Sequence, residues 1–85
     1  MTDYLFNYIN YTIMTNEEKL HLLEDVFELD ENTLTPEMVL ADIEEYDSMS
    51  KLSLIVMIDD ECHKKLTGEQ LKEFETIQDI LDFMG

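Results

Sequence analysis

Apolar residues recur every three or four positions in a segment that starts just after residue 15, as on one face of a helix. The apolar face of this segment consists of Leu20, Leu23, Val26 and Phe27. Thr15 is followed three residues later by Glu18, which together form the capping box that often opens a helix. We therefore predict a first helix over residues 16–29.

A second apolar stripe follows Asp47 and Ser48, two residue types that favour a helix start because their side-chain oxygens accept free backbone N–H groups. The members of this stripe, spaced by three or four, are Leu52, Ile55, Ile58, Cys62 and Leu66. The pattern predicts a second helix from residue 47 to about residue 66, with a length of about 27 Å.

The connection between these two helices, up to about residue 46, is longer than most loops of compact domains. Within it, Thr35 and Pro36 suit the N-cap and first position of a helix. We predict one short helical turn here, which would place Met38, Val39 and Leu40 on the core.

Two further capping signals lie near the C-terminus. Thr67 with Gln70 predicts a short third helix, and Thr76 with Asp79 predicts the last one. Their inward-facing residues are expected to be Leu71 and Phe74 in the short helix, and Ile77, Ile80, Leu81 and Met84 in the last. The whole pattern predicts an all-α fold, a small four-helix bundle of three main helices and one short helix.

Composition supports one folded domain with a short extension. The chain has 85 residues, of which 26 are Leu, Ile, Val or Phe, well above the fraction of about 20% that marks disordered chains. The first 13 residues differ from the rest, since they contain three of the four tyrosines and only one charge. We interpret residues 1–14 as an N-terminal extension and residues 15–85 as the domain.

The charge is strongly acidic, with five Lys, no Arg and 21 Asp or Glu, giving a formal net charge of −16. This excludes a conventional nucleic-acid binder and argues against an anionic membrane surface, so we expect partners with basic surfaces. The single cysteine, Cys62, and the lack of a signal peptide favour the cytoplasm. The longest apolar run, residues 54–58, is too short to span a membrane.

Ser48 carries the most specific chemistry. Taken alone, it belongs to an ordinary helix start, but a helix N-terminus also stabilises a phosphate group attached to a serine oxygen. Residues 46–49, with the sequence Tyr-Asp-Ser-Met, resemble the attachment motif of the acyl carrier protein family. The resemblance extends over residues 15–84, including the long loop, the acidic second helix and the closing helix.

The resemblance implies that Ser48 receives 4′-phosphopantetheine from coenzyme A through a separate phosphopantetheinyl transferase. Asp47 would be the adjoining acid of the motif, and Met49, which replaces the usual Leu, would cover the base of the arm. The chain would then be a monomeric carrier and not an enzyme. It would hold acyl groups as thioesters in fatty-acid, polyketide or related specialised biosynthesis, exchanging them with acyl-transferring or acyl-activating enzymes.

Charged residues of the second helix bear on the choice of partner. Asp59, Asp60 and Glu61 either dock basic partner enzymes or form a solvated helix face, and the sequence leaves both interpretations open. Lys51 stands where fatty-acid-type carriers tend to be acidic, which argues against docking to ordinary fatty-acid enzymes.

Other candidate sites are weak. His21 and His63 lie on different predicted helices without metal-ligand spacing, so we interpret both as surface residues. Cys62, on an apolar stripe, is expected to be an inert buried thiol. An unmodified acidic module that binds a basic protein surface remains the alternative function, and it would have no need of Ser48.

Overall fold

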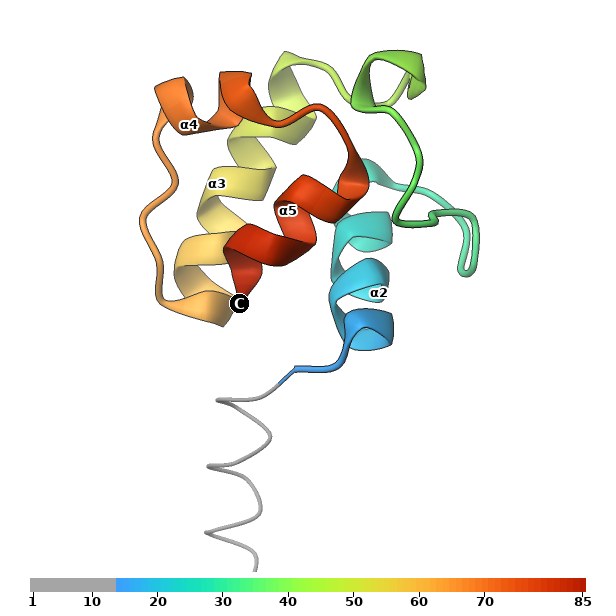
Figure 1. Ribbon diagram of the computed structural model, residues 1–85, viewed down its shortest axis with the longest axis horizontal. Helices are drawn as coiled ribbons and strands as arrows, with labels where there is room; N and C mark the ends of the chain where they lie inside the picture. The colour runs from blue at the N-terminus through green and yellow to red at the C-terminus, as the bar shows by residue number, and fades with distance from the viewer. Residues whose placement is uncertain (1–13) are drawn as a thin grey trace, which may run out of the picture.

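The computed structural model describes residues 14–85, and its regular elements are all helical (Figure 1). The elements are α2 (Asn16–Phe27), the 3₁₀ turn η1 (Leu40–Asp42), α3 (Ser48–Cys62), α4 (Gly68–Glu73) and α5 (Ile77–Met84). Helix α2 packs against both α3 and α5. The predicted all-α bundle of three main helices and one short helix is confirmed. The expected extension, residues 1–14, lies outside the described residues apart from Met14.

Each of the four α-helices starts with a capping box, in which two residues three positions apart satisfy each other's backbone N–H groups. The pairs are Thr15 with Glu18, Asp47 with Ser50, Thr67 with Gln70, and Thr76 with Asp79. The three boxes that begin with threonine are predicted by the sequence and confirmed. The Asp47–Ser50 box is an additional one, and it overlaps the motif that includes Ser48.

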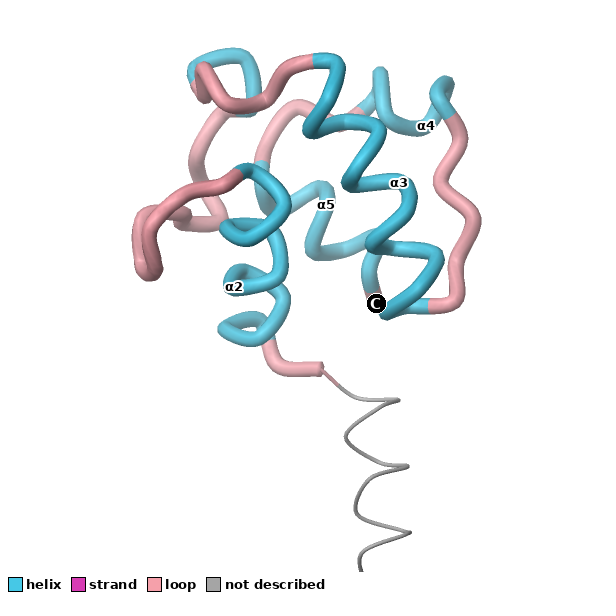
Figure 2. The backbone as a smooth tube through the Cα atoms, turned by 180° about the vertical axis from the view of Figure 1, so that it is seen from behind, coloured by secondary structure: helices cyan, strands magenta, loops and turns pink. Residues whose placement is uncertain are grey.

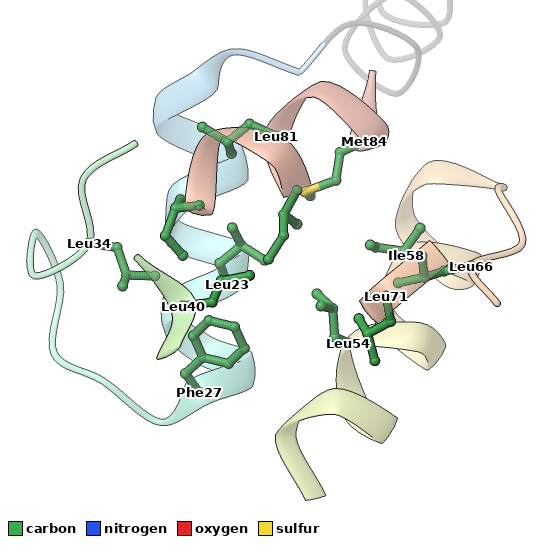
Figure 3. Close-up of a cluster of buried hydrophobic side chains, with 12 residues drawn as sticks. Leu23, Phe27, Leu34, Leu40, Leu54, Ile58, Leu66, Leu71, Leu81 and Met84 are labelled. Atoms are coloured by element: carbon green, nitrogen blue, oxygen red, sulfur yellow. The ribbon is translucent and has the colours of Figure 1, made fainter. Parts of the chain in front are cut away.

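The core lies between α2, α3 and α5, and the long loop and α4 close it (Figure 3). Its buried members are Leu23, Phe27, Leu34, Leu40, Leu54, Ile58, Leu66, Leu71, Ile77, Ile80, Leu81 and Met84. The predicted inward face of α5 is confirmed in full. Leu34 and Leu40 belong to the connection between α2 and α3, so this connection is tied to the core by two buried side chains.

The predicted apolar stripe of α3 is wrong at Leu52. Leu52 is 60% exposed, whereas Leu54 is fully buried and lies one turn before the buried Ile58. Residues two positions apart on a helix point about 200° from each other, so the two leucines occupy opposite faces. Every residue from 52 to 58 except Ser53 is apolar, and periodicity alone does not separate the two faces in such a run.

Both long helices are shorter than predicted. Helix α2 ends at Phe27, because Glu28 takes a left-handed conformation with φ of 57°. Helix α3 ends at Cys62, because His63 takes the same conformation with φ of 55°. Leu66, predicted as the last member of the helical stripe, instead reaches the core from the connection between α3 and α4.

The helical turn predicted at Thr35 and Pro36 is not formed. Backbone groups of this segment bond instead to the start of α5: Gln78 N–H donates to Pro36 C=O (2.9 Å) and Ile77 N–H to Met38 C=O (3.0 Å). Met38 and Val39 are consequently 37% and 44% exposed, contrary to expectation, and only Leu40 is buried as predicted. The loop therefore runs along the α4–α5 connection, and these contacts satisfy its backbone without a helical turn at Thr35 and Pro36.

No helix in the described part of the chain is long and apolar enough to cross a membrane.

Candidate functional site

The long loop delivers the chain to the start of α3, where Ser48 is the first helical residue (Figure 2). The Asp47 carboxylate accepts a hydrogen bond from the Ser50 N–H (2.9 Å), and the Asp47 N–H donates to Ser50 Oγ (2.9 Å). Donation from the Ser50 N–H is the main cause that lowers the pKa of Asp47 below its usual range. Asp47 is therefore ionised at neutral pH and fixes the helix start.

The three serines near this helix start have different environments. Ser50 is 7% exposed, and its hydroxyl both accepts from and donates to the Asp47 backbone. Ser48 and Ser53 are exposed. Within residues 14–85, no group hydrogen-bonds to the Ser48 hydroxyl, which is therefore open to another molecule. Met49, beside it, is 73% exposed.

Tyr46 joins the site to the core. Its ring packs edge-on against Phe27, with centroids 5.6 Å apart, and the Lys51 ammonium lies 5.0 Å from the Tyr46 ring centroid. Burial raises the pKa of the Tyr46 hydroxyl. This hydroxyl is buried and has no hydrogen-bond partner among the described residues. A buried polar group without a hydrogen bond usually lowers the stability of a fold by about 1–3 kcal/mol. The edge-on packing and the Lys51 cation thus hold the motif against the bundle.

A cavity of about 620 Å³ opens between η1, the first turn of α3 and α4, which lie along the upper edge of Figure 1. Its lining residues are Val39, Leu40, Ala41, Tyr46, Lys51, Gly68, Leu71, Lys72, Phe74 and Glu75. The wall is mostly apolar, with two lysines and one glutamate. The sequence did not single out Lys72, because nothing in its local pattern distinguishes it from any other exposed lysine.

Two hollows flank α3 on other sides. The smaller, of about 320 Å³, adjoins the start of the helix and includes Asp47, Met49 and two further acids, Glu28 and Glu45. The other, of about 460 Å³, lies further along α3. Its lining residues are Leu52, Ser53, Val56, Met57, Asp60 and Glu61.

The acidic cluster lies at the far end of α3 from Ser48. Asp59, Asp60 and Glu61 are all exposed. At 1.5 Å per residue, the cluster begins about 16 Å from Ser48 along the helix axis. The exposed side chains of Leu52 and Val56 lie between the two ends of the helix. One partner surface is therefore able to meet both Ser48 and the acidic cluster.

Glu24 is a buried carboxylate that organises the long loop, and its role was missed at the sequence level. It accepts hydrogen bonds from the backbone N–H groups of Thr33 and Leu34 (3.0 Å each). His21 Nδ1 lies 3.1 Å from its other oxygen. These bonds lower the pKa of Glu24 despite its burial. The i, i+3 spacing of His21 and Glu24 was the available signal, but it does not reveal the loop contact.

Other candidate groups form no additional site. No cluster of metal-binding residues occurs among residues 14–85. Cys62 is partly buried, and burial raises the pKa of its thiol, which keeps it protonated. His63 is exposed as predicted, whereas His21 is only partly so.

Comparison with known proteins agrees with this architecture. The family model described as "Phosphopantetheine attachment site" matches residues 20–84, which include most of α2 and all of the later helices. An acyl carrier protein of Thermosynechococcus vestitus is 27% identical over 64 residues, which are 75% of this chain and 79% of that protein. No solved structure matches the chain. The chain belongs to the acyl carrier protein family, whose members hold 4′-phosphopantetheine covalently and act as carriers, not as enzymes.

Proposed function

We propose that Ser48 is the residue that receives 4′-phosphopantetheine, and that the chain carries acyl groups as thioesters on this arm. The observation that carries the proposal is the exposed Ser48 hydroxyl at the first position of α3, directly after the Asp47 cap. Ser50 is buried and hydrogen-bonded to Asp47. Ser53 lies in the second turn of α3, away from the helix end whose partial positive charge stabilises a phosphate.

In the attachment step, the Ser48 oxygen attacks the β-phosphorus of coenzyme A. A phosphoester bond to serine forms, and the pyrophosphate bond breaks. Adenosine 3′,5′-bisphosphate leaves, and the serine proton passes to a base of the transferase. The new phosphodiester then lies at the N-terminus of α3, where backbone N–H groups and the helix dipole favour an anion.

Intact mass spectrometry tests the attachment residue. After incubation with coenzyme A and a broad-specificity phosphopantetheinyl transferase, the chain should gain about 340 Da, a single arm attached at a helix N-terminus. Ser48→Ala should abolish the gain, and Ser53→Ala is the matched control that should retain it. A gain in the Ser48→Ala variant, or no gain with several transferases, would overturn the assignment.

We also propose that Asp59, Asp60 and Glu61 contribute to docking of enzymes with basic surfaces. The support is their exposure, together with their position on the helix that starts at Ser48. Polyketide and related specialised pathways fit the chain better than ordinary fatty-acid synthesis, because Lys51 adds a positive charge one turn from Ser48. The cytoplasmic location and the monomeric state remain predictions.

Charge reversal tests the docking surface. Asp59→Lys with Asp60→Lys should lower kcat/KM for arm transfer at low salt, since each exposed charge pair contributes about 1 kcal/mol or less, up to about five-fold. Asp25→Lys with Glu37→Lys makes the same charge change on exposed residues away from α3. Equal rates for both double variants would make the acidic cluster a solvated face only.

A further inference from the structure

We infer that the cavity beside α3 accepts an acyl chain that ends in a carboxylate. The inference rests on the proposed function, because the arm on Ser48 would deliver the acyl chain. It goes further by naming the chemical class of cargo, which is an acyl group derived from a dicarboxylic acid. The evidence is the distribution of charge around the two hollows beside the start of α3, both of which the arm could reach.

The cavity wall is positively charged in a protein that is otherwise acidic. Two of the five lysines of the chain, Lys51 and Lys72, line it, against one acid, Glu75. The formal charge of the wall is therefore positive, although the chain as a whole has a net charge of −16. A chance distribution of 21 acids and five lysines would make such a wall negative.

Neither lysine is neutralised by the protein. The ion pairs found within residues 14–85 all involve His21, so no described carboxylate lies within ion-pair distance of Lys51 or Lys72. Lys51 is held over the face of the Tyr46 ring, 5.0 Å from its centroid, and Tyr46 is itself packed against Phe27. A cation is thus positioned at the cavity wall and lacks an anionic partner.

The remaining lining is suited to the methylene part of such a cargo. Val39, Leu40, Leu71 and Phe74 form an apolar wall beside the two ammonium groups. A volume of about 620 Å³ exceeds the space that a short acyl chain needs. An apolar stem with a terminal carboxylate matches this combination, since the stem loses contact with water while the carboxylate gains two cations.

The alternative hollow at the same helix end repels the same cargo. It contains Asp47, Glu28 and Glu45 and no lysine. Lys51, in contrast, lies three residues after Ser48, about 5 Å along the helix axis. An anionic acyl end on a flexible arm is therefore driven toward the lysine-lined cavity and away from the acidic hollow.

The experiment compares two acyl groups of equal carbon number on the complete chain. A transferase loads Ser48 from adipoyl-coenzyme A or from hexanoyl-coenzyme A, and intact mass confirms each product. Methyl NMR spectra then report on Val39 and Leu71, which line the cavity. We expect the ratio of enclosed to free acyl chain to be about 3- to 10-fold higher for adipoyl than for hexanoyl at low salt, and to fall at high salt.

Three variants assign the effect to the cavity charges. Lys51→Met with Lys72→Met should remove the preference for adipoyl while the apolar stems are retained. Glu75→Gln should increase the preference, because it removes the one acid of the wall. Lys65→Met, a lysine outside the cavity lining, is the matched control and should leave the preference unchanged.

The outcomes separate the two proposals. Failure to load Ser48 with either acyl group would overturn the proposed function and this inference with it. Successful loading with equal enclosure of adipoyl and hexanoyl, or a preference that survives the double lysine variant, would overturn the inference alone.

Discussion

At the residue scale, His21 and Glu24 link the first helix to the loop that leads to Ser48. The Glu24 side chain is 3% exposed, and it accepts bonds from two backbone N–H groups of the loop as well as from His21. Removal of water from a carboxylate is unfavourable unless hydrogen bonds replace the lost hydration, and these bonds do so. The His21 contact adds a group that titrates near neutral pH.

The hydrogen bond to Glu24 is the main cause that raises the pKa of His21 above its usual 6.5. A raised folded-state pKa means that the protonated histidine stabilises the fold. This contribution is complete below pH 6.5, and it is lost as the pH rises through the folded-state pKa. We expect His21→Gln to reduce the free energy of unfolding more at pH 6 than at pH 8, as measured by urea denaturation.

At each pH, the free energy of unfolding of the His21→Gln variant is compared with that of the parent chain. The parent alone is not sufficient, because its many acids also make its stability depend on pH. Glu24→Gln provides a second check: with the carboxylate removed, His21 loses its main favourable contact, and the same pH dependence should weaken. Parallel pH profiles for the parent chain and the His21→Gln variant would contradict an energetic role for this pair.

At the element scale, α3 is the helix whose two faces have separate tasks. One face is buried through Ser50, Leu54 and Ile58. The other face exposes Met49, Leu52 and Val56, beside the acidic cluster at the far end. Exposed apolar side chains on one helix face are typical of a surface that meets other proteins. Helix α3 therefore combines a structural face with a face available to partners.

Two leucine substitutions test this division. Leu54→Ala should lower the free energy of unfolding by about 3 kcal/mol, because it leaves a cavity in the core. Leu52→Ala is the matched control, and it should change stability by about 0.5 kcal/mol or less. Thermal or urea unfolding of both variants measures the difference. Similar losses for the two would contradict the assignment of the faces.

The sequence was sufficient for the elements with strong local signals. Threonine capping boxes predicted the starts of α2, α4 and α5, and the 3.6-residue period predicted the inward face of α5. The sequence was insufficient where tertiary contacts determine the backbone conformation. Thr35 and Pro36 have helix-start chemistry, but the segment bonds to the start of α5 instead.

The candidate site was predictable only in part, for the same reason. The motif around Ser48 is a local signal and was found. The cavity is formed by η1, α3 and α4, which are far apart in sequence, so no spacing rule brings Lys51 and Lys72 together. The buried face of α3 was predicted wrongly at Leu52, because Leu52 and Leu54 belong to one nearly continuous apolar run.

At the scale of the whole molecule, charge repulsion opposes the compact fold. A net charge of −16 is carried by 85 residues, and within residues 14–85 no acid pairs with a lysine. Like charges at the surface destabilise a folded state because folding brings them closer together. The core must therefore offset a repulsive contribution whose size depends on the surrounding ions.

We accordingly expect the melting temperature to rise by a few degrees when salt increases from about 0.01 M to about 0.1 M, since the Debye length falls from about 30 Å to about 10 Å. Calorimetry or circular dichroism at constant pH measures the shift. The Asp59→Asn, Asp60→Asn variant removes two adjacent like charges from α3, so its melting temperature should be higher at low salt and should depend less on salt. A flat salt dependence in the parent chain would mean that its carboxylates are too far apart, or too well hydrated, to destabilise the fold.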